Sequence, residues 1–284
     1  MTSPIPSVID QQTRWATSKG FETRNAYLGS VADNLRQELS SGALADFQRG
    51  GSRQLRNRGI KPPRMQALRS SAALSANVFD YWRSRDPYPL QYALHLRERI
   101  TRVSFEENFP TGLSGNPPNV DVLLRLENNE CIAIESRFTN WLTARDRSIE
   151  PRYLADGVQW WTLAGLPKCQ ALAESLREGG AFSHLDVPSL LKHALGLATR
   201  SGAFEIYYIY FDWDCAESAE HADELERFAE LVGDEFRFSA MTYQELFARL
   251  ASRARAEDAP YIEYLTGRYS QRDPLGTITV EEPA

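Results

Sequence analysis

The stretch NVDVLLRLENNECIAIESRFTN, residues 119–140, decides the fold that we expect for this chain. Residues 122–126 form one nearly continuous apolar run, residues 131–134 form a second, and an Asn-rich polar turn separates the two. Short apolar runs on either side of such a turn predict a β-hairpin. Because each run is apolar at successive positions, we expect both strands to be covered on both faces.

Charged residues interrupt this apolar pattern at one end of the expected hairpin. Asp121 opens the first strand, and Glu135 and Arg137 lie two apart on the second strand, so their side chains share a face. The hairpin can therefore bring Asp121 beside Glu135. Two converging carboxylates supply the oxygen ligands that Mg²⁺ prefers, and the neighbouring cation can contact a phosphate. The plainer alternative is a structural ion pair between Glu135 and Arg137 in a scaffold protein.

In this order of residues the chain resembles the PD-(D/E)XK restriction-endonuclease-like nuclease superfamily, where Asp and then Glu-x-Lys bind metal and activate water at a phosphodiester. The matching residues are Asp121, Glu135, Ser136 and Arg137, with Arg where that pattern has Lys. Asn119 and Val120 also replace the Pro-containing lead-in of the pattern.

The wider chain is similar to successive blocks of one bacterial nuclease-like subfamily. These blocks lie at residues 132–141, 184–197, 204–214 and 241–250. The resemblance covers roughly residues 70–270, with a few residues of uncertainty at each element edge. It implies an α/β fold with a mixed central sheet flanked by helices, preceded here by a helical N-terminal extension. It also implies Mg²⁺ (or Mn²⁺) held by Asp121 and Glu135, and DNA as the partner.

The superfamily also suggests a further acid from the helix before the first strand. We expect that helix over residues 88–100, followed by a strand from residue 101, so Glu98 is the candidate and Glu106 and Glu107 are rivals. For each of these carboxylates, a solvated or salt-bridged position is the alternative.

A second group of secondary candidates lies on the helix expected over residues 188–199. Ser189 and Lys192 are three apart and share a helix face, which can meet the scissile phosphate if the helix packs across the sheet. The related sequences carry Gln where this chain has Ser189. The alternative for both residues is surface exposure, and His193 beside them is expected to be a packing or surface residue.

A basic stretch over residues 48–69 contrasts with the net charge of −6, and no acidic residue occurs between Asp46 and Asp80. Its Gly and Pro residues predict a loop rather than a helix in its first part. Two interpretations are open, an arm that contacts phosphates and a solvated linker. The candidate nucleic-acid contacts are Arg53, Arg56, Arg58, Lys61 and Arg64.

Apolar spacing predicts a helix over residues 24–42 that docks on the main domain or on a second subunit, so a homodimer through the N-terminal helices is possible. We divide the chain into an extension at 1–65, a nuclease-like domain at 66–276 and a flexible tail at 277–284. The sequence has no secretory signal and no apolar run near the roughly 20 residues of a membrane span, so we expect a cytoplasmic protein without membrane contact. Its three cysteines are far apart, which fits a reducing compartment.

These observations lead to two functional hypotheses. The first is a metal-dependent endonuclease that hydrolyses phosphodiester bonds in DNA. The second is a catalytically lapsed nuclease-fold protein that binds nucleic acid or a partner protein. Arg137 separates them, because Arg cannot give up its proton to act as a base. Removal of either Asp121 or Glu135 is expected to leave the fold intact, because two unliganded carboxylates repel each other.

Overall fold

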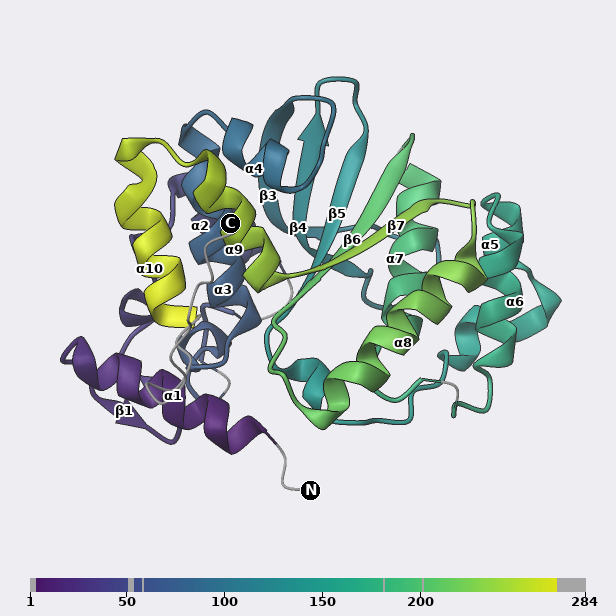
Figure 1. The fold of residues 1–284 in the computed structure, drawn as a ribbon. Helices are drawn as coiled ribbons and strands as arrows, with labels where there is room; N and C mark the ends of the chain where they lie inside the picture. The colour runs from purple at the N-terminus through teal and green to yellow at the C-terminus, as the bar shows by residue number, and fades with distance from the viewer. Residues whose placement is uncertain (1–3, 51–53, 58, 181, 201, 270–284) are drawn as a thin grey trace, which may run out of the picture.

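The structure of the chain, a computed structural model, describes residues 4–50, 54–57, 59–180, 182–200 and 202–269. Its centre is a five-stranded sheet in the order β3-β4-β5-β6-β7 (Figure 1). The first three strands are antiparallel, and the last two continue the sheet in parallel. The mixed α/β fold predicted from the sequence is confirmed. The strands are β3 (Ile100–Asn108), β4 (Asn119–Leu126), β5 (Cys131–Arg137), β6 (Phe204–Tyr210) and β7 (Arg237–Thr242).

The predicted hairpin is β4 and β5, and its strands are covered on both faces. Val122 pairs with Ile134, and Leu123 pairs with Ala133. Because neighbouring side chains on a strand point to opposite faces, the Val122–Ile134 pair enters one hydrophobic core and the Leu123–Ala133 pair enters the other. The nearly continuous apolar runs therefore have a direct physical reason, since the apolar residues of these strands are buried on both faces of the sheet.

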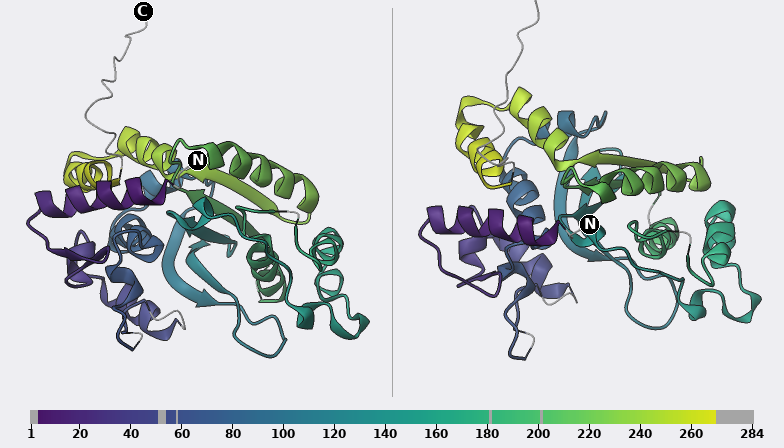
Figure 2. Two further views of the ribbon diagram at one scale, coloured as in Figure 1. Left: turned by 90° about the horizontal axis from the view of Figure 1, so that it is seen from below. Right: turned by 60° about the horizontal axis from the view of Figure 1, so that its bottom comes forward.

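Two layers of helices cover the sheet (Figures 1 and 2). The core on one side includes residues of α3 (Ser71–Phe79), α4 (Tyr88–Ala93), α9 (Tyr243–Arg253) and α10 (Ala259–Tyr269). The core on the other side includes residues of α5 (Trp160–Leu163), α6 (Pro167–Ser175), α7 (Val187–Arg200) and α8 (Ala216–Val232). None of the helices in the described ranges has the length and apolar character needed to cross a bilayer.

The N-terminal helix α1 (Ile5–Ser18) packs against its own chain, beside α10 at the other end of the sequence (Figure 2). The guanidinium of Arg268 lies 4.0 Å from the centre of the Trp15 ring, and the side chain of Gln12 donates to the Arg268 carbonyl at 3.1 Å. The apolar face of α1 is therefore already buried inside one chain, and the homodimer remains a prediction.

The helix predicted over residues 24–42 is wrong. The chain instead forms the short strands β1 (Thr23–Arg24) and β2 (Tyr27–Leu28), and a helix begins only at α2 (Ser41–Arg49). Asn25 and Ala26 adopt positive φ angles of 52° and 62°, which an α-helix does not allow. The apolar side chains in this segment contact the main core from an irregular chain, so their helix-like spacing is misleading.

The helix predicted before β3 is shorter than expected. It ends at Ala93 in α4, and His95 follows with a positive φ of 53°, so the helix cannot continue to residue 100. β3 in turn is longer than predicted and extends to Asn108. This change places Glu106 and Glu107 inside a strand of the central sheet. The tail predicted at 277–284 lies outside the described residues.

Candidate active site

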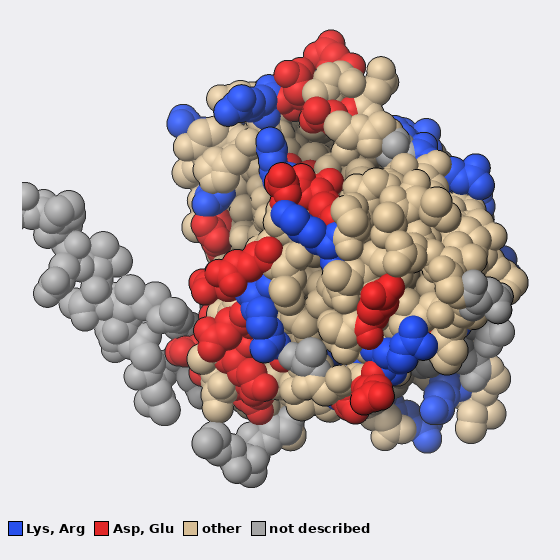
Figure 3. Space-filling view, turned by 90° about the vertical axis from the view of Figure 1, so that its right-hand side faces the viewer, with Lys and Arg blue, Asp and Glu red and all other residues tan. Residues whose placement is uncertain are grey.

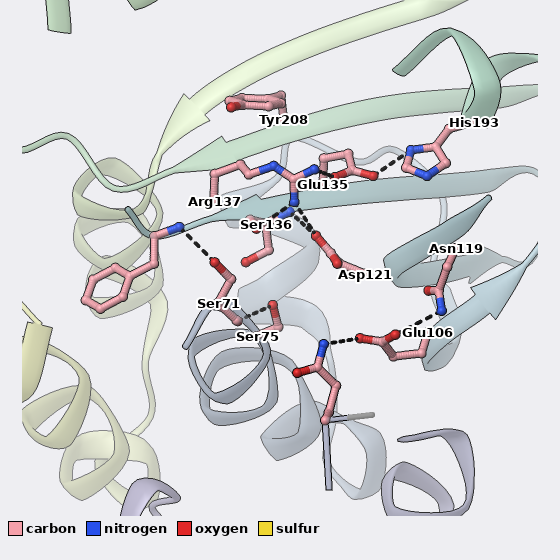
Figure 4. A network of polar contacts seen from close by, with 12 residues as sticks. Ser71, Ser75, Glu106, Asn119, Asp121, Glu135, Ser136, Arg137, His193 and Tyr208 are labelled. Atoms are coloured by element: carbon pink, nitrogen blue, oxygen red, sulfur yellow. Dashed lines mark hydrogen bonds and ion pairs between the residues drawn. The ribbon is translucent and has the colours of Figure 1, made fainter. Parts of the chain in front are cut away.

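Asp121, Glu135 and Arg137 come together at one end of the hairpin (Figure 4). Asp121 and Glu135 lie one step beyond the Val122–Ile134 pair of β4 and β5, which sets them opposite each other on the same face of the sheet. Arg137 follows two residues later on that face. The structure therefore assembles the three residues that the sequence selected.

The guanidinium of Arg137 connects the oxygen atoms of this site. Its Nη1 donates to Asp121 Oδ2 at 3.0 Å and to the carbonyl of Ser136 at 3.2 Å. Its Nη2 forms an ion pair with Glu135 Oε2. The backbone N–H of Ser136 also donates to Asp121 Oδ2 at 2.9 Å. Two carboxylates and one carbonyl therefore converge on a single cationic group.

Glu135 has a second partner, a histidine from helix α7. Nδ1 of His193 lies 2.5 Å from Glu135 Oε1, and both side chains are buried. Arg137 and His193 together lower the pKa of Glu135 to about 2 even though burial alone raises it. We therefore describe Glu135 as ionised at neutral pH.

Asp121 is in a different electrostatic environment. Burial raises its pKa to about 7, with a further contribution from the neighbouring charge of Glu135, and Arg137 opposes this shift only in part. Glu106 on β3 raises the pKa of Asp121 as well. Glu106 lies across from Asp121, between the Phe105–Val122 and Glu107–Val120 pairs. The two carboxylates of the site thus differ in protonation at neutral pH.

Of the secondary acids, Glu106 reaches the site and Glu98 does not. Glu98 is exposed just before β3, at the strand end that pairs with Leu126. Leu126 lies five positions from Asp121 along β4, which is about 16 Å along a strand. Glu98 is misplaced because α4 ends early. Glu106 is buried and accepts hydrogen bonds from Asn119 at 2.9 Å and Gln54 at 3.2 Å.

The Ser189 and Lys192 candidates lie on α7, and that helix does pack across the sheet as expected. Lys192, however, donates to Glu150 at 3.0 Å, and the backbone N–H of Ser189 donates to the helix-capping carboxylate of Asp186 at 3.2 Å. The residue of this helix that contacts the site is His193. The Lys192 side chain is thus engaged with Glu150, and neither Lys192 nor Ser189 is among the residues that line the cleft at the site.

A cleft of about 1180 Å³ opens onto the site, and Asp121 and Arg137 are among its lining residues. Its lining residues come from the N-terminal segments up to the start of α3, from β3 and β4, and from the chain between the end of β5 and the start of α7. Its lining includes three carboxylates and six arginines, which reverses the net charge of the whole chain. The carboxylates are Glu106, Asp121 and Asp186, and the arginines are Arg49, Arg64, Arg69, Arg137, Arg145 and Arg147.

The structure brings part of the predicted basic stretch to this cleft. Arg64 lines it, whereas Arg56 and Lys61 are exposed and lie outside its lining. Arg53 and Arg58 fall outside the described residues. Figure 3 shows the side of the molecule at the right of Figure 1, where Lys and Arg groups are interspersed with Asp and Glu groups. The described residues of that face form no continuous basic surface.

The oxygen atoms of the site fit a hard divalent cation by their chemistry. Carboxylate and carbonyl oxygens are the ligands that Mg²⁺ takes, and Asp121, Glu135 and Ser136 each direct one such oxygen at the same group. Across the residues with a described placement, no set of three or more His, Cys, Asp or Glu side chains gathers to hold a metal ion. A cation at this site would therefore share its ligands with the guanidinium of Arg137.

The sequence interpretation missed His193 and ranked Glu106 too low. A signal for His193 was present, because it lies three residues after Leu190 and four before Leu197 and so falls on the apolar face of α7. A polar side chain on an otherwise buried helix face needs a partner inside the protein. No sequence signal showed that this partner is Glu135.

No curated protein and no solved structure matches the chain. A family model does match, and it covers residues 10–270, so it includes both strands of the hairpin, the His193 helix and nearly all of the residues around the cleft. The chain belongs to the restriction-endonuclease-like family described as "Restriction Endonuclease associating with ARP".

Proposed function

We propose that this protein is a metal-dependent endonuclease of the PD-(D/E)XK type that hydrolyses phosphodiester bonds in DNA. The observation that carries the proposal is the convergence of Asp121, Glu135 and the Ser136 carbonyl at the end of β4 and β5, beside an arginine-lined cleft. Membership of a restriction-endonuclease-like family supports the same conclusion.

In this proposal Asp121 and Glu135 hold Mg²⁺ (or Mn²⁺), with the carbonyl of Ser136 as a third oxygen. When bound, the ion supplies a Lewis acid that polarises the phosphate and acidifies a water molecule. His193 fixes one oxygen of Glu135, so that the other faces the guanidinium. Arg137 contributes a permanent positive charge for the phosphoryl oxygens, and its planar fork suits two oxygens at once.

The cleft offers the route by which DNA reaches these groups. Arg64 and Arg69 line the cleft from the segment before α3, and Arg145 and Arg147 line it from the segment after β5. Arginines from two segments can contact more than one phosphate of a bound backbone. Such contacts position the nucleic acid and carry no sequence preference of their own.

One observation favours a second candidate, a catalytically lapsed protein that binds nucleic acid or a partner. The Arg137 guanidinium already contacts both carboxylates and the Ser136 carbonyl. It therefore competes directly with a metal ion for these oxygens. In this second candidate the arginine is the permanent cation of the site and no hydrolysis follows.

Substitutions at Arg137 separate the two candidates. We would assay wild type, Arg137→Lys and Arg137→Ala with Mg²⁺ and Mn²⁺ on linear, supercoiled and single-stranded DNA, and measure Mn²⁺ binding by calorimetry. The endonuclease proposal expects cleavage by wild type, kept or raised in the Lys variant and lost in the Ala variant. Both variants are expected to bind Mn²⁺ at least as tightly as wild type, because the competing guanidinium is gone.

Two other outcomes contradict this proposal. Cleavage by Arg137→Lys without cleavage by wild type indicates a nuclease that lapsed through this one substitution. Absence of cleavage and of Mn²⁺ binding in all three proteins supports the binding protein instead. Asp121→Ala serves as the control, because the site assignment requires it to lose metal binding, and cleavage equal to that of wild type refutes the assignment.

A further inference from the structure

We propose that the N-terminus of α3 and the hydroxyl of Thr139 form a phosphate subsite beside the candidate active site. It takes a DNA backbone phosphate adjacent to the one that is hydrolysed. The inference deepens the proposed function and rests on it, because its ligand is the same DNA strand.

The first part of the argument is the free end of helix α3. Ser70 caps this helix, since its Oγ accepts the N–H of Ala73 at 3.2 Å and its carbonyl accepts the N–H of Leu74. The N–H groups of Ser71 and Ala72 have no acceptor inside the helix. Both residues line the cleft. A helix N-terminus carries partial positive charge and suits a phosphate.

The second and independent observation is the side chain of Thr139. It is 1% exposed, and its hydroxyl has no hydrogen-bond partner within the part of the chain that the structure describes. Buried hydroxyls are nearly always paired, so an unpaired one at a cleft is free to bind a ligand there. Thr139 lines the same cleft as Ser71.

A hydrogen bond holds these two parts side by side. The backbone N–H of Phe138, the residue before Thr139, donates to Ser71 Oγ at 3.1 Å (Figure 4). Thr139 lies two residues beyond Arg137, roughly 7 Å along an extended chain. A phosphate held here is therefore close to the oxygens of Asp121 and Glu135 but separate from them. Arg69, exposed and directly before the helix cap, adds positive charge to the same segment of the cleft lining.

The test is the substitution Thr139→Val, which keeps the shape of the side chain and removes the hydroxyl. A fluorescently labelled DNA duplex is titrated in EDTA, so that cleavage cannot interfere. We expect Thr139→Val to weaken binding about tenfold, the loss typical of one hydrogen bond to a charged group. Its melting temperature should stay level or rise, because an unpaired buried hydroxyl has been removed. Thr139→Ser, which keeps the hydroxyl, should bind like wild type.

Thr162→Val is the matched control. Thr162 is exposed and lies outside the cleft lining, so its substitution should leave binding unchanged. A scan in which single phosphates are replaced by neutral methylphosphonates adds a second measurement. At one position, replacing the phosphate should weaken DNA binding by wild type. The same replacement should not weaken DNA binding by Thr139→Val any further.

Each outcome of this experiment has a distinct meaning. Equal DNA binding by Thr139→Val and wild type overturns the subsite and leaves the proposed function intact. No DNA binding by wild type overturns both. If Thr139→Val lowers the melting temperature, the methylphosphonate scan decides between a subsite and a structural role. The subsite is overturned if each replaced phosphate lowers the DNA affinity of wild type and of Thr139→Val equally.

Discussion

Two carboxylates face the same guanidinium in this protein, and the strands that carry them give them opposite properties. Glu135 on β5 is buried between Arg137 and His193, and these two partners lower its pKa to about 2. Asp121 on β4 shares only Arg137, and burial together with the neighbouring acids raises its pKa to about 7. The neighbouring side chains therefore matter more than burial, which acts on both groups in the same direction.

The difference also divides the site into a fixed part and a responsive part. Glu135 is held on both of its oxygens by side chains from β5 and α7. Asp121 lines the cleft, and 27% of its side chain is exposed. A metal ion or phosphate that enters from the cleft therefore meets Asp121 first. The positive charge of a metal ion favours the ionised form of Asp121, and the negative charge of a phosphate favours the protonated form.

The largest expected effect is on the free energy of unfolding when the fixed carboxylate is lost. Glu135→Gln leaves the buried guanidinium of Arg137 with one carboxylate fewer, and breaking such a pair typically costs about 3–5 kcal/mol. Asp121→Asn should keep or raise stability at pH 8, because it removes a charge that its surroundings disfavour. Urea unfolding of both variants at pH 8 measures the comparison. Equal losses in the two variants would show that the two carboxylates are equivalent after all. The sequence-based expectation that folding survives the loss of either carboxylate stays a prediction.

The next effect is a pH dependence that belongs to Asp121. Its folded-state pKa of about 7 lies above the roughly 3.9 of an unfolded Asp, so between these values the folded protein binds a proton that the unfolded chain has released. By linkage, this group lowers stability as the pH rises through that window and adds no further change above it. The stability of Asp121→Asn relative to wild type should therefore grow from pH 4 to pH 7, by about 4 kcal/mol at most. A relative stability that is flat with pH would contradict the raised pKa.

A smaller effect is expected at His193, where the chain offers a matched pair of variants. His193→Ala removes the contact to Glu135 Oε1, and a hydrogen bond to a charged group contributes about 1.5–3 kcal/mol. His193→Gln supplies an amide donor and should recover part of that stability and of the Mn²⁺ affinity. If the Gln variant is as impaired as the Ala variant in both measurements, packing of the ring rather than its contact to Glu135 matters.

The smallest effect concerns the binding of DNA in the cleft that Asp121 lines. Neutralising Arg64 and Arg69, which line the cleft, should reduce the salt dependence of DNA binding by about 0.9 in logarithmic slope per lost phosphate contact. The same changes at Arg56 and Lys61, which are exposed but outside the cleft, should have less effect. Equal slopes for the two pairs would return the whole stretch to the status of a linker.

Much of this molecule could be predicted from local patterns. The hairpin follows from two apolar runs and an Asn-rich turn, and α7 follows from its spacing and its Asp186 cap. The prediction failed for residues 24–42, where apolar residues spaced as in a helix belong to an irregular segment with two positive φ angles. The spacing of apolar residues indicates which side chains become buried. It does not determine the backbone conformation of the segment that carries them.

The sequence by itself placed Asp121, Glu135 and Arg137 at one end of a hairpin, because the period of a strand sets residues two apart on one face and the turn brings the two strands together. Only the tertiary structure decided what surrounds them. His193 reaches Glu135 from a helix 58 positions later, and Glu106 faces Asp121 because α4 ends at Ala93 and β3 extends to Asn108. A charge acts through space on whatever lies within a few ångströms, whichever part of the chain supplies it. The protonation of the two carboxylates is therefore a property of the packed protein, even though their positions follow from the hairpin.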